Sequence, residues 1–184
     1  MKEKRVKKIL NASYLNQDEA NKKLKKMGYT YDTELSTNDN KVFVDKYGNP
    51  NIAFRGTHKG RVKDLVSDLA ILTGLQKYDT RFKEAKHLTK LVEDKYHKPV
   101  NTFGHSLGGA LAEHSGASGK IITHSKGTGI GDLFKEIPKN QVDYRNKNDI
   151  VSLLSLTQNH SHHNLKEKDT HHDKYDVLGN HAIV

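Results

Sequence analysis

The chain has 184 residues, a formal net charge of +9 and no cysteine. The length suits one domain over residues 1–184, and the lack of cysteine excludes disulfides, thiolate metal ligands and a cysteine nucleophile. No stretch approaches the roughly 20 apolar residues that span a bilayer, and no apolar signal-peptide core follows the charged N-terminus, so we expect a soluble protein that is intracellular or packaged in a particle.

Predicted elements alternate between strands and helices along the chain. Predicted strands occupy 41–45, 51–54, 120–124 and 141–145. Residues 98–103 are expected to form a turn and then a short strand, and 175–178 a last short strand or an extended segment. Predicted helices occupy 14–27, 61–72, 82–96 and 107–115. A polar, histidine-rich loop is expected over 158–173. This alternation predicts an α/β domain whose mostly parallel central sheet is flanked by helices.

The pentapeptide Gly104-His105-Ser106-Leu107-Gly108 matches G-x-S-x-G, the nucleophile elbow of α/β-hydrolases. In that turn, a serine between a strand and a helix exposes its Oγ to a histidine base. The turn crowds the positions two residues before and after the serine, where glycine has no Cβ. The predicted strand before the motif and helix after it supply the required context. The sequence therefore predicts Ser106 as a nucleophile.

A serine hydrolase also needs an acid, and in α/β-hydrolases the chain order is serine, acid, histidine. Asp149 is the favoured acid, because it follows the strand predicted over 141–145, and parallel sheets build sites at the carboxyl ends of their strands. Alternatives remain at the other aspartates that follow the serine. These are Asp132, Asp143, Asp169, Asp173 and Asp176.

For the base, His181 is favoured because apolar residues on both sides would hold it rigidly. The other histidines after Asp149 lie in the polar tract, and they remain alternatives: His160, His162, His163, His171 and His172. This tract lacks a fixed ligand spacing, so we expect no metal and no cofactor.

Two backbone donors are expected for the oxyanion hole. One is the N–H of Leu107, the residue after the nucleophile. The other is expected from the strand-end loop Arg55-Gly56-Thr57, where glycine allows close backbone approach and Thr57 offers an N–H and a hydroxyl.

Taken together, these motifs resemble a class 3 (fungal-type) lipase. The resemblance rests on five segments in order, which are Ile52–Thr57, Asp64–Leu69, Gly104–Ala112, Ile122–Asp132 and Asn148–Val151. It implies an α/β-hydrolase fold, a triad of Ser106, Asp149 and His181, and an oxyanion hole at Thr57 and Leu107. The compact length is similar to that of lipase-like proteins of large DNA viruses and their parasites. Residues 58–74 correspond to the family's lid, or equally to an ordinary core helix.

The resemblance implies hydrolysis of lipid carboxylic esters through an acyl-enzyme, on triacylglycerols or phospholipids. The positive charge of the chain favours peripheral contact with anionic membranes. No recognised nucleic-acid-binding motif occurs in the sequence, so nucleic acid is not expected as a partner. The alternative is a catalytically inactive lipid- or membrane-binding protein on a hydrolase scaffold.

Overall fold

The computed structural model describes residues 1–57, 76–127, 136–146, 164–168 and 183. Seven strands form one sheet in the order of the chain. The strands are β1 (Thr30–Asp32), β2 (Asn40–Val44), β3 (Pro50–Phe54), β4 (Asn101–His105), β5 (Ile121–His124), β6 (Gln141–Asn146) and β7 (Asn164–Lys168). The helices are α1 (Glu3–Ser13), α2 (Gln17–Lys26), α4 (Gln76–Tyr96) and α5 (Leu107–His114).

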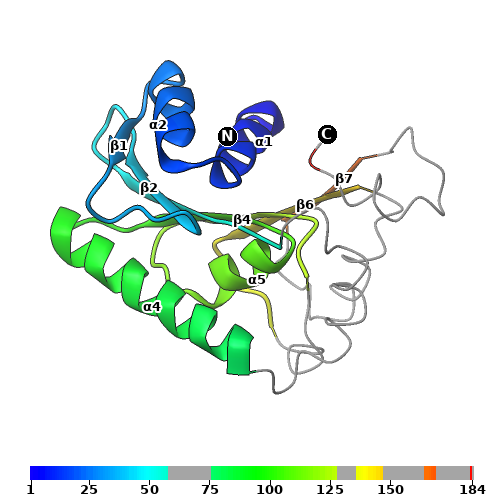
Figure 1. The fold of residues 1–184 in the computed structure, drawn as a ribbon. Helices are drawn as coiled ribbons and strands as arrows, with labels where there is room; N and C mark the ends of the chain where they lie inside the picture. Colours follow the sequence, from blue (N-terminus) through cyan, green and yellow to red (C-terminus); the bar gives the residue numbers. More distant parts are fainter. Residues whose placement is uncertain (58–75, 128–135, 147–163, 169–182, 184) are drawn as a thin grey trace.

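The sheet is mixed, and its parallel part carries the site. Strands β1 to β3 pair antiparallel, and β3 to β7 pair parallel. Crossovers between adjacent parallel strands are right-handed, so a strictly sequential order places their helices on one face. Figure 1 shows α4 and α5 on that face and α1 and α2 on the other. The carboxyl ends of β3 to β6 therefore meet at one edge, between two helical layers.

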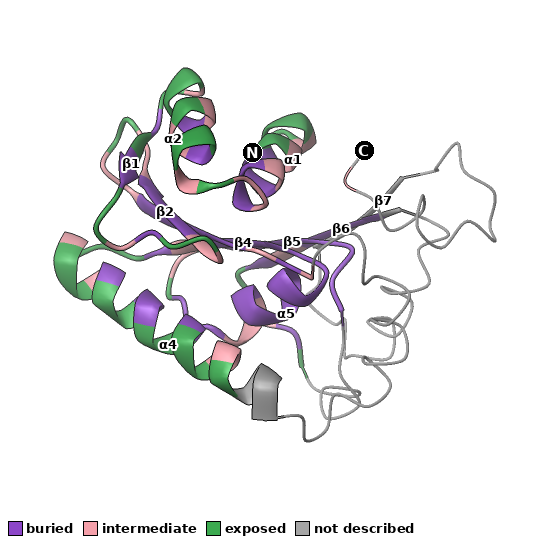
Figure 2. Ribbon diagram, viewed as in Figure 1, coloured by how far each residue is buried: buried purple, intermediate pink, exposed green. Residues whose placement is uncertain are grey.

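Alternating side chains build a separate core on each face of the sheet. Phe43, Ala53 and Phe103 belong to the core under α1 and α2. Their neighbours Val42 and Ile52 belong to the core under α4 and α5. Figure 2 shows the central strands as an almost continuous buried layer. Both faces are covered, one by α4 and α5 and the other by α1 and α2, so the parallel strands are buried on both sides.

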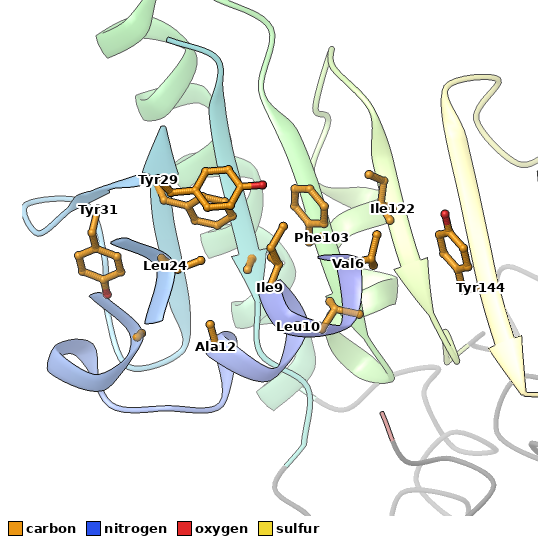
Figure 3. Packing of buried hydrophobic residues seen from close by; sticks show 13 residues of the cluster. Val6, Ile9, Leu10, Ala12, Leu24, Tyr29, Tyr31, Phe103, Ile122 and Tyr144 are labelled. Carbon is orange, nitrogen blue, oxygen red and sulfur yellow. The ribbon is translucent and has the colours of Figure 1, made fainter. Parts of the chain in front are cut away.

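Helix α1 was not predicted from the sequence. Its buried Val6, Ile9 and Leu10 follow helical spacing, while basic residues fill the positions between them. Figure 3 shows these three side chains directed at the sheet, near Phe103 and Ile122. The helix predicted over 14–27 is the shorter α2, which begins after Asn16.

Asn16 explains where α2 begins. Its side chain accepts a hydrogen bond from the Glu19 N–H at 2.9 Å, a capping contact that satisfies one of the helix's free donors. The chain between the two helices, including Tyr14, crosses near the carboxyl ends of the strands.

Most of the other predicted elements that can be compared are confirmed within a few residues, including the hairpin of β2 and β3 and the strand–turn–helix around Ser106. Strand β1 was missed. The predicted polar loop over 158–173 is wrong at 164–168, where β7 extends the sheet beside β6. The helix predicted over 61–72, the lid segment 58–74 and the strand over 175–178 lie outside the described residues. Within the described part of the chain, no helix has the length and apolar character needed to cross a bilayer.

Candidate active site

Ser106 stands at a sharp turn between β4 and α5. Its backbone has φ 57° and ψ −128°, a combination that costs energy for a residue with a Cβ. The glycines around it behave as predicted. A Cβ on Gly104 would overlap the backbone carbonyl of Gly108, and a Cβ on Gly108 would overlap the carbonyl oxygen of Phe54. Both positions therefore require glycine for this turn to form.

Backbone hydrogen bonds from neighbouring strands hold the strained residue. The Ser106 N–H donates to the His124 carbonyl at 3.2 Å, and the Gly127 N–H donates to the Ser106 carbonyl at 3.1 Å. The Ser106 carbonyl also accepts from the Gly109 N–H at 2.9 Å, which begins α5. The turn is thus fixed to the end of β5 as well as to its own helix.

The Ser106 hydroxyl makes no structural hydrogen bond within the described part of the chain. A serine at a helix N-cap normally accepts a hydrogen bond from the first turn, but Ser106 makes no such side-chain bond. The residue is 2% exposed, and its Oγ has no hydrogen-bond partner among the described residues. Leaving a buried hydroxyl without a hydrogen bond costs free energy in the folded protein. Such a cost is expected at a site that a catalytic base or a substrate completes.

The predicted oxyanion segments flank this hydroxyl. Leu107 is the first residue of α5, where backbone N–H groups lack intrahelical acceptors. On the other side, a Cβ on Gly56 would lie 3.3 Å from the Ser106 Cβ. The loop after β3 therefore passes directly beside the nucleophile, and the partly exposed Thr57 follows it.

Asp149 and His181 lie outside the described residues, so the triad stays a prediction. Asp143, one of the alternative acids, is placed: it is 4% exposed and points into a polar cluster. Its Oδ1 accepts from the Gln141 Nε2 at 2.9 Å and from the Thr123 hydroxyl, and its Oδ2 lies 3.7 Å from the Lys126 Nζ. Lys126 also pairs with Glu113 of α5. This buried ionic cluster links α5 to β5 and β6, and the Asp143 carboxylate is engaged in it.

The structure adds two groups at the strand ends that the sequence did not identify. Tyr14, from the α1–α2 connection, hydrogen-bonds the His105 Nδ1 at 2.8 Å. Burial raises the pKa of the Tyr14 hydroxyl above its ordinary value. The ring of His124 lies beside that of His105, with centroids 5.8 Å apart. No sequence pattern links Tyr14 to His105, because 91 positions separate them.

Arg81 of α4 braces the loop after β3. Its Nη2 donates to the Arg55 carbonyl at 2.6 Å. Arg55 in turn pairs with Asp39, and the Arg55 N–H donates to the Asp39 carbonyl at 2.9 Å. Burial lowers the pKa of the Arg81 guanidinium, but an arginine stays protonated at ordinary pH. Within the described ranges, no group of three or more His, Asp or Glu side chains could hold a metal ion.

Comparisons with known proteins agree with this fold. The crystal structure of the Lip2 lipase from Yarrowia lipolytica superimposes with a TM-score of 0.55, covering 81% of this chain and 73% of that one at 15% identity. This likeness confirms the predicted α/β-hydrolase fold. No curated protein sequence matches the chain, and the suggested viral similarity stays a prediction. A Tle-like phospholipase domain model matches residues 7–127, well over half of the chain. The chain therefore belongs to the family of Tle-like phospholipase domains.

Proposed function

We propose that this protein hydrolyses carboxylic esters of lipids through a serine acyl-enzyme. The observation that carries the proposal is Ser106 itself: a strained, glycine-flanked serine at a strand–helix turn, with a buried hydroxyl that no described residue binds. A fold has little reason to keep such a residue unless the hydroxyl reacts. Membership of a phospholipase-like family supports lipid esters as the substrate class.

In the proposed mechanism, Ser106 attacks the ester carbonyl while His181 accepts its proton. Asp149 holds the histidine tautomer and stabilises the imidazolium. The negative oxygen of the tetrahedral intermediate is bound by the backbone N–H of Leu107 and by the N–H or hydroxyl of Thr57. The alcohol leaves with the proton from His181, and water then attacks the acyl-enzyme by the same route. No cofactor is needed for this sequence of steps.

Phospholipids are the preferred substrates in this proposal, because the net charge of +9 favours adsorption to anionic membranes. Triacylglycerols are the competing substrates. Hydrolysis of phospholipid vesicles should rise as the anionic lipid fraction rises and should fall with added salt. A rate that is independent of both would remove the argument for anionic membranes without affecting the esterase proposal.

The central test replaces Ser106 by alanine and measures release of p-nitrophenol from medium-chain esters, together with labelling by a fluorophosphonate probe. We expect Ser106→Ala to lose roughly 10³-fold or more in activity and all labelling. Ser115→Ala is the matched control, since Ser115 is a buried serine at the other end of α5 whose hydroxyl donates to the Ala112 carbonyl. Wild-type protein that binds vesicles but neither turns over esters nor takes the probe would favour the inactive lipid-binding alternative.

A further inference from the structure

We propose that Tyr14 and Arg81 are positioning residues that clamp the peptide between Arg55 and Gly56 from opposite sides, and so fix the oxyanion loop beside Ser106. This inference rests on the proposed function. It assigns roles to two side chains that lie far from the motif and outside the predicted triad.

The Tyr14 side of the clamp is defined by two contacts. The Tyr14 hydroxyl lies 2.8 Å from the His105 Nδ1, and it lies directly against Gly56. The close approach is confirmed by the space around Gly56, where a Cβ would lie 2.5 Å from both the Tyr14 hydroxyl and the His105 carbonyl. Three distant segments therefore meet at this one oxygen.

The bond to His105 carries this contact towards the nucleophile. A phenol can both donate and accept, so either tautomer of the His105 ring can share the bond with the Tyr14 hydroxyl. His105 directly precedes Ser106, so Tyr14 links the loop at Gly56 to the residue before the nucleophile.

The Arg81 side acts on the same peptide unit. The Arg55 carbonyl and the Gly56 nitrogen belong to one planar peptide, so fixing either residue restrains the whole unit. Arg81 of α4 donates to the carbonyl at 2.6 Å, while the hydroxyl of Tyr14, which follows α1, packs against Gly56. Since α1 and α4 cover opposite faces of the sheet (Figure 1), the peptide between Arg55 and Gly56 is held by side chains from both helical layers.

Holding this peptide in place also fixes the expected oxyanion donor. The donor expected from this loop is Thr57, the residue after Gly56, so its position depends on how firmly this peptide is held. A glycine offers little intrinsic resistance to rotation of its peptide, and Gly56 cannot be replaced without collision. Tyr14 and Arg81 thus supply the rigidity that the backbone itself lacks, which matters because misplacement by about 1 Å can cost about 10²-fold in rate.

The test uses Tyr14→Phe, which keeps the ring and removes only the hydroxyl. We expect kcat for p-nitrophenyl esters to fall about 10- to 100-fold with little change in KM, below the roughly 10²–10³-fold loss of a whole oxyanion donor. Affinity for an alkyl boronic acid, which mimics the tetrahedral intermediate, should fall in parallel with kcat. Tyr29→Phe is the matched control, because Tyr29 is a buried tyrosine whose hydroxyl accepts from the Arg5 Nε, away from the loop after β3.

A second variant and a second readout keep the proposal open to refutation. Arg81→Lys perturbs the same peptide from the other face of the sheet and should also lower kcat. The fold-loss of kcat in the double variant should be smaller than the product of the two single fold-losses. Hydrogen exchange of the Arg55 amide, which donates to the Asp39 carbonyl at 2.9 Å, should accelerate at least about 10-fold in Tyr14→Phe when it is followed by NMR.

The outcomes separate the two proposals. If wild type turns over esters but Tyr14→Phe and Arg81→Lys match Tyr29→Phe in kcat and boronate affinity, the clamp is overturned and the esterase stands. If wild type shows no esterase activity, the esterase proposal fails, and the exchange rate of the Arg55 amide alone decides the clamp: acceleration in Tyr14→Phe supports it, and an unchanged rate refutes it. If Tyr14→Phe does not fold, the same measurements on Arg81→Lys decide in the same way.

Discussion

Lys41 makes a sharp prediction about stability and pH. This lysine lies on β2 opposite Ala53 and is completely buried. Its Nζ donates to the carbonyls of Thr37 and Asn38 at 2.8 and 2.9 Å. Burial, reinforced by the nearby positive charge of Arg55, lowers the pKa of Lys41 from 10.5 to about 8. The folded protein therefore holds this proton less tightly than the unfolded chain does.

The sign follows from proton binding. Between pH 8 and 10.5, the unfolded chain carries a proton on Lys41 that the folded protein has lost, so the free energy of unfolding rises with pH across this window. The full gain is the pKa difference at about 1.4 kcal/mol per unit, or about 3 kcal/mol. Below pH 8 the lysine is charged in both states, and this part of the stability is absent.

Urea unfolding from pH 7 to 10 measures the effect. We expect the wild type to gain about 2–3 kcal/mol relative to Lys41→Met as pH rises across that range, because methionine keeps the apolar stem and does not titrate. Lys22→Met, on the exposed side of α2, should track the wild type. Parallel curves for the wild type and Lys41→Met would show that Lys41 titrates normally, and the reasoning from burial would be wrong.

Two further substitutions test the supports of the elbow. Gly104→Ala should destabilise the fold by about 1–3 kcal/mol or more and lower esterase activity by about 10²-fold or more, because the new methyl would collide with the Gly108 carbonyl. Gly28→Ala is its control, with φ +82° but open space around it, so it should lose only about 1 kcal/mol and keep full activity; equal behaviour of the two variants would contradict the collision argument. Glu113→Gln should cost about 2–4 kcal/mol in urea unfolding, because it removes one of the two carboxylates near the buried Lys126, and a loss below about 1 kcal/mol would show that Asp143 alone suffices.

The sequence was most informative where the determinants of structure are local. The turn at Ser106 needs glycine at two nearby positions, and those glycines are visible in the motif. The β2–β3 hairpin likewise depends on a short turn between two apolar strands. Such features can be predicted because the residues that collide or pair are only a few positions apart.

Prediction failed where high charge hid an apolar pattern. Val6, Ile9 and Leu10 carry the helical spacing of α1, but the many basic residues around them suggested only a charged terminus. Strand β7 was missed because its segment is polar and borders histidines, although β6 gives it a partner for pairing. In both cases the deciding contribution is tertiary packing or pairing, which local composition does not reveal.

The contacts that brace the site are the least visible in the sequence. Tyr14 meets His105 across 91 positions, and Arg81 meets Arg55 across 26. Neither pair forms a sequence pattern, and the packing of α1 and α4 against the sheet brings the partners together. Asp149 and His181 were proposed from chain order and flanking residues, and they remain predictions because they lie outside the described residues.

The elbow and its supports together explain why this site requires both helical layers. Backbone strain at Ser106 persists only if surrounding contacts determine the conformation more strongly than the local preference of the chain. One contact comes from the end of β5, through the Ser106 N–H and the His124 carbonyl. Tyr14, next to α1, and Arg81, on α4, fix the adjoining loop from opposite faces. A nucleophile beside an aligned oxyanion loop is therefore a property of the assembled three-layer fold, and the pentapeptide alone specifies only the turn.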